Sequence, residues 1–200
     1  MVQPEALKSK ILSLELLRLV FANAGHAFRS SGRFLDAVRE NFVPVVAENA
    51  VSTVEGIFQL AVSMFSMLVE QFRKYLKNEI GLLLDQVFLQ IAESPHASYK
   101  QKLMALSVCS KICRDSQMLV GIFLNFDCGD KQLNIFQRIV NLLENFCCVK
   151  LSEQQWLHQP ENIRLRRSAI EIMVAIIRSM LEWVIKAKKK VKLFVADVTG

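Results

Sequence analysis

Side chains suited to metal binding or acid–base chemistry are concentrated in one short segment, Leu124–Asp130. It carries an amide at Asn125, carboxylates at Asp127 and Asp130, and a thiol at Cys128. Two carboxylates in one turn supply fewer than the roughly six to eight oxygen ligands that calcium takes. Asp and Asn side chains also bond backbone N–H groups at turns and helix starts. We therefore interpret the segment as a turn in which at least one acid caps the following helix.

The cysteines form a second possible metal site. Cys109 and Cys113 are four residues apart, so they share one face of a helix and could supply two ligands. No other Cys or His pair has the spacing of a structural zinc site. Free cysteines are commonly buried as small apolar residues, and we expect that role for this pair. The odd total of five, without a secretory segment in the first ten residues, predicts reduced thiols.

The sequence predicts neither a catalytic site nor a cofactor. Its three histidines, His26, His96 and His158, fall at expected turns and have no nucleophile motif nearby. A glycine-rich phosphate loop and a dinucleotide-binding fingerprint are both missing from the sequence. The remaining carboxylates are spread among Lys and Arg, as on ordinary helix surfaces. We therefore expect a protein that is not an enzyme within these residues.

The net charge of +6 comes largely from one end of the chain. Lysines between residues 186 and 192 supply most of it, and the rest is close to neutral. Nucleic-acid binding is not expected, because a basic stripe interleaved with aromatics is missing. The lysines could touch acidic lipid, but a solvated helix end that complements the helix dipole is preferred. With no targeting segment and no run of ~20 apolar residues, we expect a cytoplasmic protein.

Hydrophobic residues make up 52% of the chain and recur at helical spacing, whereas Gly and Pro are few. This pattern predicts an all-α protein of about eight helices with short connections and no sheet. Several apolar stripes are wide, which favours an armadillo- or HEAT-like stack, an α-α superhelix, whose helices are covered on both sides. A compact bundle is the alternative. Residues 1–185 are expected to form a single domain, followed by a basic tail at 186–200 that is a candidate for disorder.

Turn-forming residues indicate where the helices end. Gly25 is expected to end the first helix in the left-handed conformation, and Pro44 to kink or break the second. Ser52–Glu55 is a candidate capping box. Further boundaries are expected at Asn78 and Gly81, Ser94–Pro95, Asp115 and a loop at Leu151–Glu161, and the one candidate strand is Val191–Val195.

The polar segment and the residues after it resemble a known family. Leu124–Cys128 followed by Leu133–Val140 is similar to the signature box of the HUS domain, the region upstream of the Sec-seven domain in large Arf guanine-nucleotide exchange factors. The resemblance is to the Golgi, brefeldin-A-inhibited group. Gly129 and Gln137 depart from the acidic residue and the glutamate usual at those positions. Further similarity covers Leu12–Leu17, Asn23–Gly25 with Phe28–Arg29, and Leu165–Ala169 with Met180 and Trp183.

This resemblance implies an armadillo-like regulatory domain without exchange activity, because the catalytic domain lies downstream in the family. The implied partners are the N-terminal dimerisation and cyclophilin-binding domain of the same protein, the downstream exchange domain, and Arf or Arf-like GTPases. The resemblance also implies autoregulation, peripheral association of the full protein with Golgi or trans-Golgi membranes, and a role in vesicle-mediated protein transport. The alternatives are a helical-repeat scaffold of another pathway and a membrane module acting through the lysines.

Within the resembled box, seven residues are expected to form a structural and protein-interaction site: Asn125, Phe126, Asp127, Cys128, Asn134, Phe136 and Arg138. Asn125 and Asp127 are expected to bond backbone groups that fix the turn before Leu133. Phe126 and Cys128 are expected to pack the turn down. Replacement of Asn125 by Ala should then leave buried polar partners unpaired, at ~1–3 kcal/mol.

Overall fold

Helices account for all the regular secondary structure of this computed structural model in the residues that it describes. These are residues 4–128, 133–148 and 159–199, with side chains described up to Lys189. Where α and π segments run on without a break, they form nine helical runs, and this part of the chain contains no strand. The expected all-α fold is confirmed. The chain divides into two compact units, residues 1–97 and 98–200, and the expected single domain at 1–185 stays a prediction.

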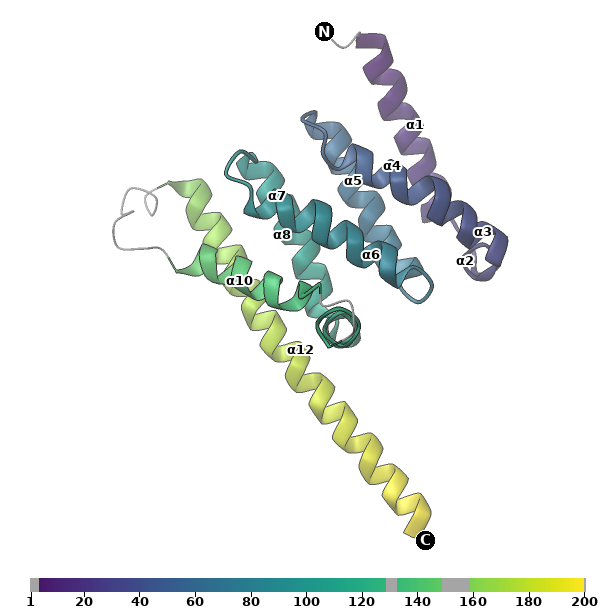
Figure 1. Cartoon of the computed structure of the whole chain (residues 1–200), viewed down its shortest axis with the longest axis vertical. Helices are drawn as coiled ribbons and strands as arrows, with labels where there is room; N and C mark the ends of the chain where they lie inside the picture. Colours follow the sequence, from purple (N-terminus) through teal and green to yellow (C-terminus); the bar gives the residue numbers. More distant parts are fainter. Residues whose placement is uncertain (1–3, 129–132, 149–158, 200) are drawn as a thin grey trace. The chain divides into compact units, whose positions relative to one another are not determined.

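Unit 1 runs from α1 to α7 (Figure 1). Its first helix is α1 (Pro4–Ala22), followed by the short α2 (His26–Ser30). The π turn Val38–Phe42 joins α3 (Gly32–Ala37) to α4 (Val43–Asn49). A second π turn, Leu68–Phe72, extends α5 (Glu55–Met67), and a third, Leu84–Leu89, joins α6 (Lys77–Leu83) to α7 (Gln90–Glu93).

Aromatic rings around α5 form the core of unit 1. α5 packs against α1 and α4, and Phe58, Phe65 and Phe72 on α5 and its π turn are fully buried. The Phe65 ring lies 4.4 Å from that of Phe88, measured between centroids. Phe21 of α1 packs edge-on against Phe72. Pairs of aromatic rings contribute ~0.5–1.5 kcal/mol beyond the burial of their area, so these contacts hold the helices of unit 1 in register.

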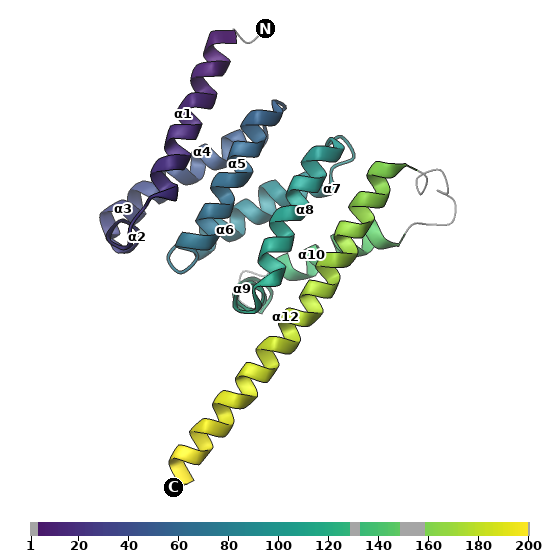
Figure 2. The same cartoon turned by 180° about the vertical axis from the view of Figure 1, so that it is seen from behind.

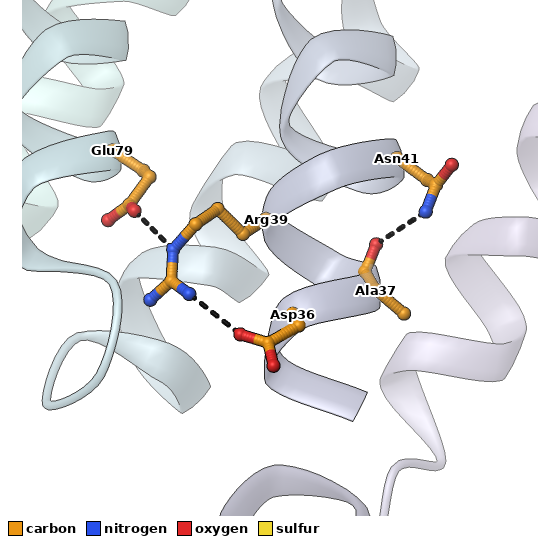
Figure 3. A network of polar contacts seen from close by, with 5 residues as sticks. All are labelled: Asp36, Ala37, Arg39, Asn41 and Glu79. Atoms are coloured by element: carbon orange, nitrogen blue, oxygen red, sulfur yellow. Dashed lines mark hydrogen bonds and ion pairs between the residues drawn. The ribbon is translucent and has the colours of Figure 1, made fainter. Parts of the chain in front are cut away.

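A surface ion-pair network also joins two runs of unit 1 (Figure 3). Arg39 Nε donates to Glu79 Oε1 at 2.6 Å, and a terminal nitrogen of Arg39 donates to Asp36 Oδ1 at 2.9 Å. The hydrogen bond to Glu79 raises the pKa of Arg39. Exposed pairs of this kind are screened by water and salt, so the network orients α6 more than it stabilises the unit.

Unit 2 is organised by its last helix. It contains α8 (Tyr99–Arg114), α9 (Ser116–Ile122) with the π turn Phe123–Asp127, α10 (Ile135–Cys147) and α12 (Pro160–Thr199). Both views show α12 running along α8 and α10, and it also contacts α9 (Figures 1 and 2). One face of α12 is buried at intervals of three or four residues: Leu165, Ala169, Ile172, Ile176 and Ser179. Ser179 Oγ donates to the Cys113 carbonyl at 2.7 Å, which satisfies a buried hydroxyl.

Two predicted caps are wrong. Gly25 is not left-handed; its φ of −73° and ψ of 173° are extended, and it precedes α2 as its N-cap residue. Ser52 is not the N-cap of α5, because the helix begins only at Glu55 and its N-cap residue is the extended Val54. Ser52 Oγ accepts instead from the Val54 N–H at 3.2 Å, within the turn. A true capping box forms between Ser98 and Gln101 at the start of α8.

Other boundaries are confirmed or shifted. Ser94–Pro95 and the Asp115 cap lie where predicted. The helix around Pro44 departs from α geometry as the π turn Val38–Phe42, since proline lacks an N–H and its ring crowds the preceding turn. Gly81 is buried inside α6 rather than at a junction, which lies at residues 73–76. Val191–Val195 is helical, not a strand, and most of the expected loop at 151–161 lies outside the described residues.

We predict that Cys109 and Cys113 resist labelling in the folded chain. Both are buried, as expected, and burial raises the pKa of Cys109 to about 12 and also raises the pKa of Cys113. Because the thiolate is the reactive form, a disulfide reagent at about pH 8 should modify the exposed Cys128 and Cys148 at once. Cys109 and Cys113 should react only after unfolding in denaturant. Rapid modification of all five thiols in native buffer would contradict this burial.

Candidate functional site

The predicted box lies where the π turn after α9 leads into α10. The π turn ends with Asp127, and α10 begins at Ile135, with residues 129–132 outside the described part of the chain. The backbone closes across this gap, because the Asn134 N–H donates to the Phe126 carbonyl at 3.2 Å. Cys128 N–H also donates back to the Phe123 carbonyl at 3.1 Å. The two sides of the box are therefore hydrogen-bonded to each other through main-chain groups.

Asp127 caps α10 from the preceding helical turn. Its Oδ2 accepts from the Phe136 N–H and its Oδ1 from the Gln137 N–H, both at 3.0 Å. These are the second and third residues of α10, whose N–H groups have no partner inside the helix. The N-cap residue itself, Asn134, makes no side-chain cap bond. The carboxylate therefore replaces the local cap and also places negative charge at the positive end of the helix dipole.

Asn134 has a left-handed backbone. Its φ is 50° and its ψ 38°, and it is the one non-glycine residue with positive φ in the described ranges. Asn tolerates this region better than other side chains with a Cβ, because its short amide bonds locally. The Asn134 carbonyl accepts from the Arg138 N–H at 2.8 Å, so the reversal leads directly into the first turn of α10. This conformation turns the chain back toward Asp127.

Aromatic packing closes the box. Phe126 is buried, as expected, and the rings of Phe123 and Phe136 meet edge-to-face with centroids 5.6 Å apart. Phe123 was not among the predicted residues, although an aromatic three positions before Phe126 in a helical segment is the signal that could have indicated it. Phe123 and the neighbouring Leu124 remain partly exposed, so apolar surface is left beside the box.

Two expectations for the box are wrong. Cys128 is exposed and does not pack the turn down. Asn125 is exposed too, and its amide donates to the Gly121 carbonyl of its own helix rather than to the turn before Leu133. Water can replace that bond, so Asn125→Ala should change stability by within about 0.5 kcal/mol rather than by the larger amount expected from a buried site. Arg138 is half-buried on α10, and Asp130 and Gly129 lie outside the described residues.

Nowhere in the described ranges do three or more His, Cys, Asp or Glu side chains gather as a ligand set. Both oxygens of Asp127 already accept backbone N–H groups. The described part of the chain also has no helix long and apolar enough to cross a bilayer. The hydrogen bonds of Asp127 fix the direction of α10.

Comparison with protein families shows which family the chain belongs to. A family model described as the Mon2/Sec7/BIG1-like HUS domain matches residues 2–135, from before α1 to the first residue of α10. The chain belongs to this HUS-domain family. The resemblance stated from the sequence is thereby confirmed.

Relatives of this HUS domain share most of its length. It is 34% identical over 177 residues to brefeldin A-inhibited guanine nucleotide-exchange protein 1 of Rattus norvegicus, covering 88% of this chain and 10% of that protein. It is 38% identical over 185 residues to brefeldin A-inhibited guanine nucleotide-exchange protein 3 of Arabidopsis thaliana, covering 92% of this chain and 11% of that protein. The chain therefore spans about a tenth of the length of the curated relatives it matches.

We predict that the cap at Asp127 stabilises unit 2. Asp127→Ala should lower the free energy of unfolding by about 1 kcal/mol, the usual cost of a lost helix cap. Asp127→Asn keeps one acceptor oxygen and should lose less. Urea denaturation followed by circular dichroism measures both variants. An Asp127→Ala variant that unfolds at the wild-type urea concentration would show that the carboxylate does not stabilise α10.

The left-handed residue gives a second prediction. Asn134→Ala should cost about 1–2 kcal/mol, because an ordinary side chain is strained at positive φ. Asn134→Gly should cost much less, since glycine adopts this region freely. The same urea titration compares the two variants. Equal losses would mean that the Asn134 side chain, and not its backbone conformation, matters.

Proposed function

We propose that this HUS domain is a non-catalytic regulatory and protein-interaction domain of a large Arf guanine-nucleotide exchange factor. The observation that carries the proposal is the family match together with relatives named as brefeldin A-inhibited guanine nucleotide-exchange proteins. The domain supports association between domains, autoregulation and recruitment to Golgi membranes in vesicle-mediated protein transport. The exchange reaction itself belongs to another domain of the longer protein, and Arf or Arf-like GTPases are its substrates.

The geometry of the box supports an interaction role. Both carboxylate oxygens of Asp127 accept backbone N–H groups at the start of α10, so this side chain fixes the helix rather than acting as an acid or base. Next to this hydrogen-bonded turn, Leu124 is 55% exposed and Phe123 38% exposed. An apolar surface on a fixed backbone is what an interface needs at its centre. We assign this surface to the N-terminal dimerisation and cyclophilin-binding domain of the same protein.

We predict that Leu124→Ser weakens binding to that N-terminal domain at least about tenfold, because an exposed apolar contact at the box is lost. Asp127→Ala should weaken it too, by loosening the start of α10. Val51→Ser is the matched control, since Val51 is 64% exposed on unit 1 and lies far from the box in sequence. A pull-down with the tagged N-terminal domain, followed by titration, measures the affinities.

If Leu124→Ser and Asp127→Ala both bound the N-terminal domain with wild-type affinity, the box would not be part of the interface. A second measurement separates the proposal from a helical-repeat scaffold of another pathway. The sequence downstream of residue 200 in the complete gene product should encode a catalytic exchange domain. A full-length product that lacks one would favour the scaffold.

A further inference from the structure

Two segments of unit 1, residues 23–35 and 71–78, contain no Asp or Glu. The first includes the corner between α2 and α3, and the second includes the turn that leads into α6. Together they carry five basic residues: Arg29, Arg33, Arg73, Lys74 and Lys77. Neither segment therefore has a carboxylate of its own to offset its positive charge.

Aromatic contacts bring these two segments to the same end of unit 1. Phe21, near the end of α1, packs edge-on against Phe28 and Phe72, with ring centroids 5.7 and 5.9 Å away. Phe28 and Phe72 each directly precede an arginine of the basic set. Both views show the α2–α3 corner and the turn before α6 at one end of the unit (Figures 1 and 2). The basic residues of the two segments therefore share that end.

Most of this positive charge is available to a ligand. Four of the five basic residues form no ion pair with any residue that the structure describes: Arg29, Arg33, Lys74 and Lys77. Three of them are exposed, and Arg29 is half-buried. Two acids that flank the segments, Asp36 and Glu79, are both bonded to Arg39 (Figure 3). Cations that are not neutralised by neighbours attract a polyanion to this end of the unit.

Two exposed aromatic rings accompany the cations and indicate which polyanion fits. Phe34 directly follows Arg33 and is 47% exposed, and Tyr75 directly follows Lys74 and is 45% exposed. At a membrane surface, aromatic rings sit among the lipid headgroups while Lys and Arg meet the anionic lipids. An acidic protein segment would account for the cations alone, whereas an anionic membrane accounts for the cations and the exposed rings together.

We propose that this end of unit 1 binds directly to the surface of a membrane that contains anionic phospholipid. The surface, named the cationic end, consists of six residues: Arg29, Arg33, Phe34, Lys74, Tyr75 and Lys77. Its arginines donate pairs of hydrogen bonds to lipid phosphate oxygens, and its lysines act as point charges. Its two rings enter the headgroup layer. The contact forms and breaks no covalent bond, so it is reversible and depends on salt.

The inference deepens the proposed recruitment to membranes and rests on it, since it names the surface and the class of lipid that meet. The cationic end lies on unit 1, whereas the box, which is assigned to a protein domain, lies on unit 2. The two assignments therefore fail separately. A chain that binds the N-terminal domain but no anionic vesicle would overturn the lipid contact and leave the box interface in place.

Co-sedimentation of the 200-residue chain with vesicles tests the proposal. The chain should bind vesicles of phosphatidylcholine with about 30% phosphatidylserine, and should not bind phosphatidylcholine alone. Binding should weaken between about 0.1 M and about 0.5 M salt, because salt screens the attraction. The double variant Lys74→Glu with Lys77→Glu should bind about 20-fold more weakly or less, since each cation beside an anionic surface contributes a factor of about five.

Charge-matched variants show whether the position of the lysines matters. Lys8→Glu with Lys10→Glu changes the net charge equally, but these exposed residues lie in the first half of α1, and this variant should bind nearly as wild type. Equal losses in the two double variants would overturn the proposal in favour of a net-charge effect. Loss of binding only in Lys188→Glu with Lys189→Glu would assign the membrane to α12 and overturn it too. Binding of a poly-glutamate peptide without binding of vesicles would overturn it in favour of an acidic protein segment.

A second pair of variants tests the exposed ring. Tyr75→Ser should weaken binding to the anionic vesicles about threefold or more at both salt concentrations, because burial of apolar surface is not screened by salt. Leu82→Ser is the matched control, since Leu82 is 43% exposed on α6, and it should bind as wild type. Equal affinities of the two variants would overturn the membrane as the partner of the cationic end. Circular dichroism confirms that all variants are folded.

Discussion

The buried face of α12 is the contact on which unit 2 depends. α8, α9 and α10 all pack on this one partner, and α9 has only seven residues before its π turn. The apolar residues of α12 repeat every three or four positions, and the Ser179–Cys113 hydrogen bond satisfies the one buried polar side chain of this face. An isolated helix of the length of α9 or α10 is not stable in water, so burial against α12 supplies the free energy that its own backbone bonds do not. The long helix thus holds the unit in one arrangement.

The box at the start of α10 sets the direction of that helix after a sharp reversal of the chain. Asn134 turns the chain in the left-handed region, and Asp127 supplies the cap that Asn134 does not. Edge-to-face packing of Phe123 on Phe136 covers the turn. All of these contacts shape the backbone, and none prepares a reacting group.

α12 shows why a helical stack has binding surfaces at its ends. Inside a stack, a helix that is apolar on two opposite sides is covered by neighbours on both. In unit 2 one of these sides meets α8, α9 and α10, and the other, which carries the exposed Ile170, Ile177 and Leu181, meets solvent in the described structure.

The sequence by itself determined the helices, because apolar residues at helical spacing specify α1, α8 and α10 whatever surrounds them. It also indicated the buried Cys109 and Cys113, the Asp115 cap, the inward-facing Phe126 and the family. Helix ends were less predictable: Gly25 and Gly81 could each end a helix, and only packing decided that neither does. The acceptor role of Asp127 across nine residues, the reversal at Asn134 and the ring pair of Phe123 and Phe136 depend on segments meeting in space. Which apolar side of α12 is buried was likewise decided by its neighbours, since the two sides look alike in the sequence.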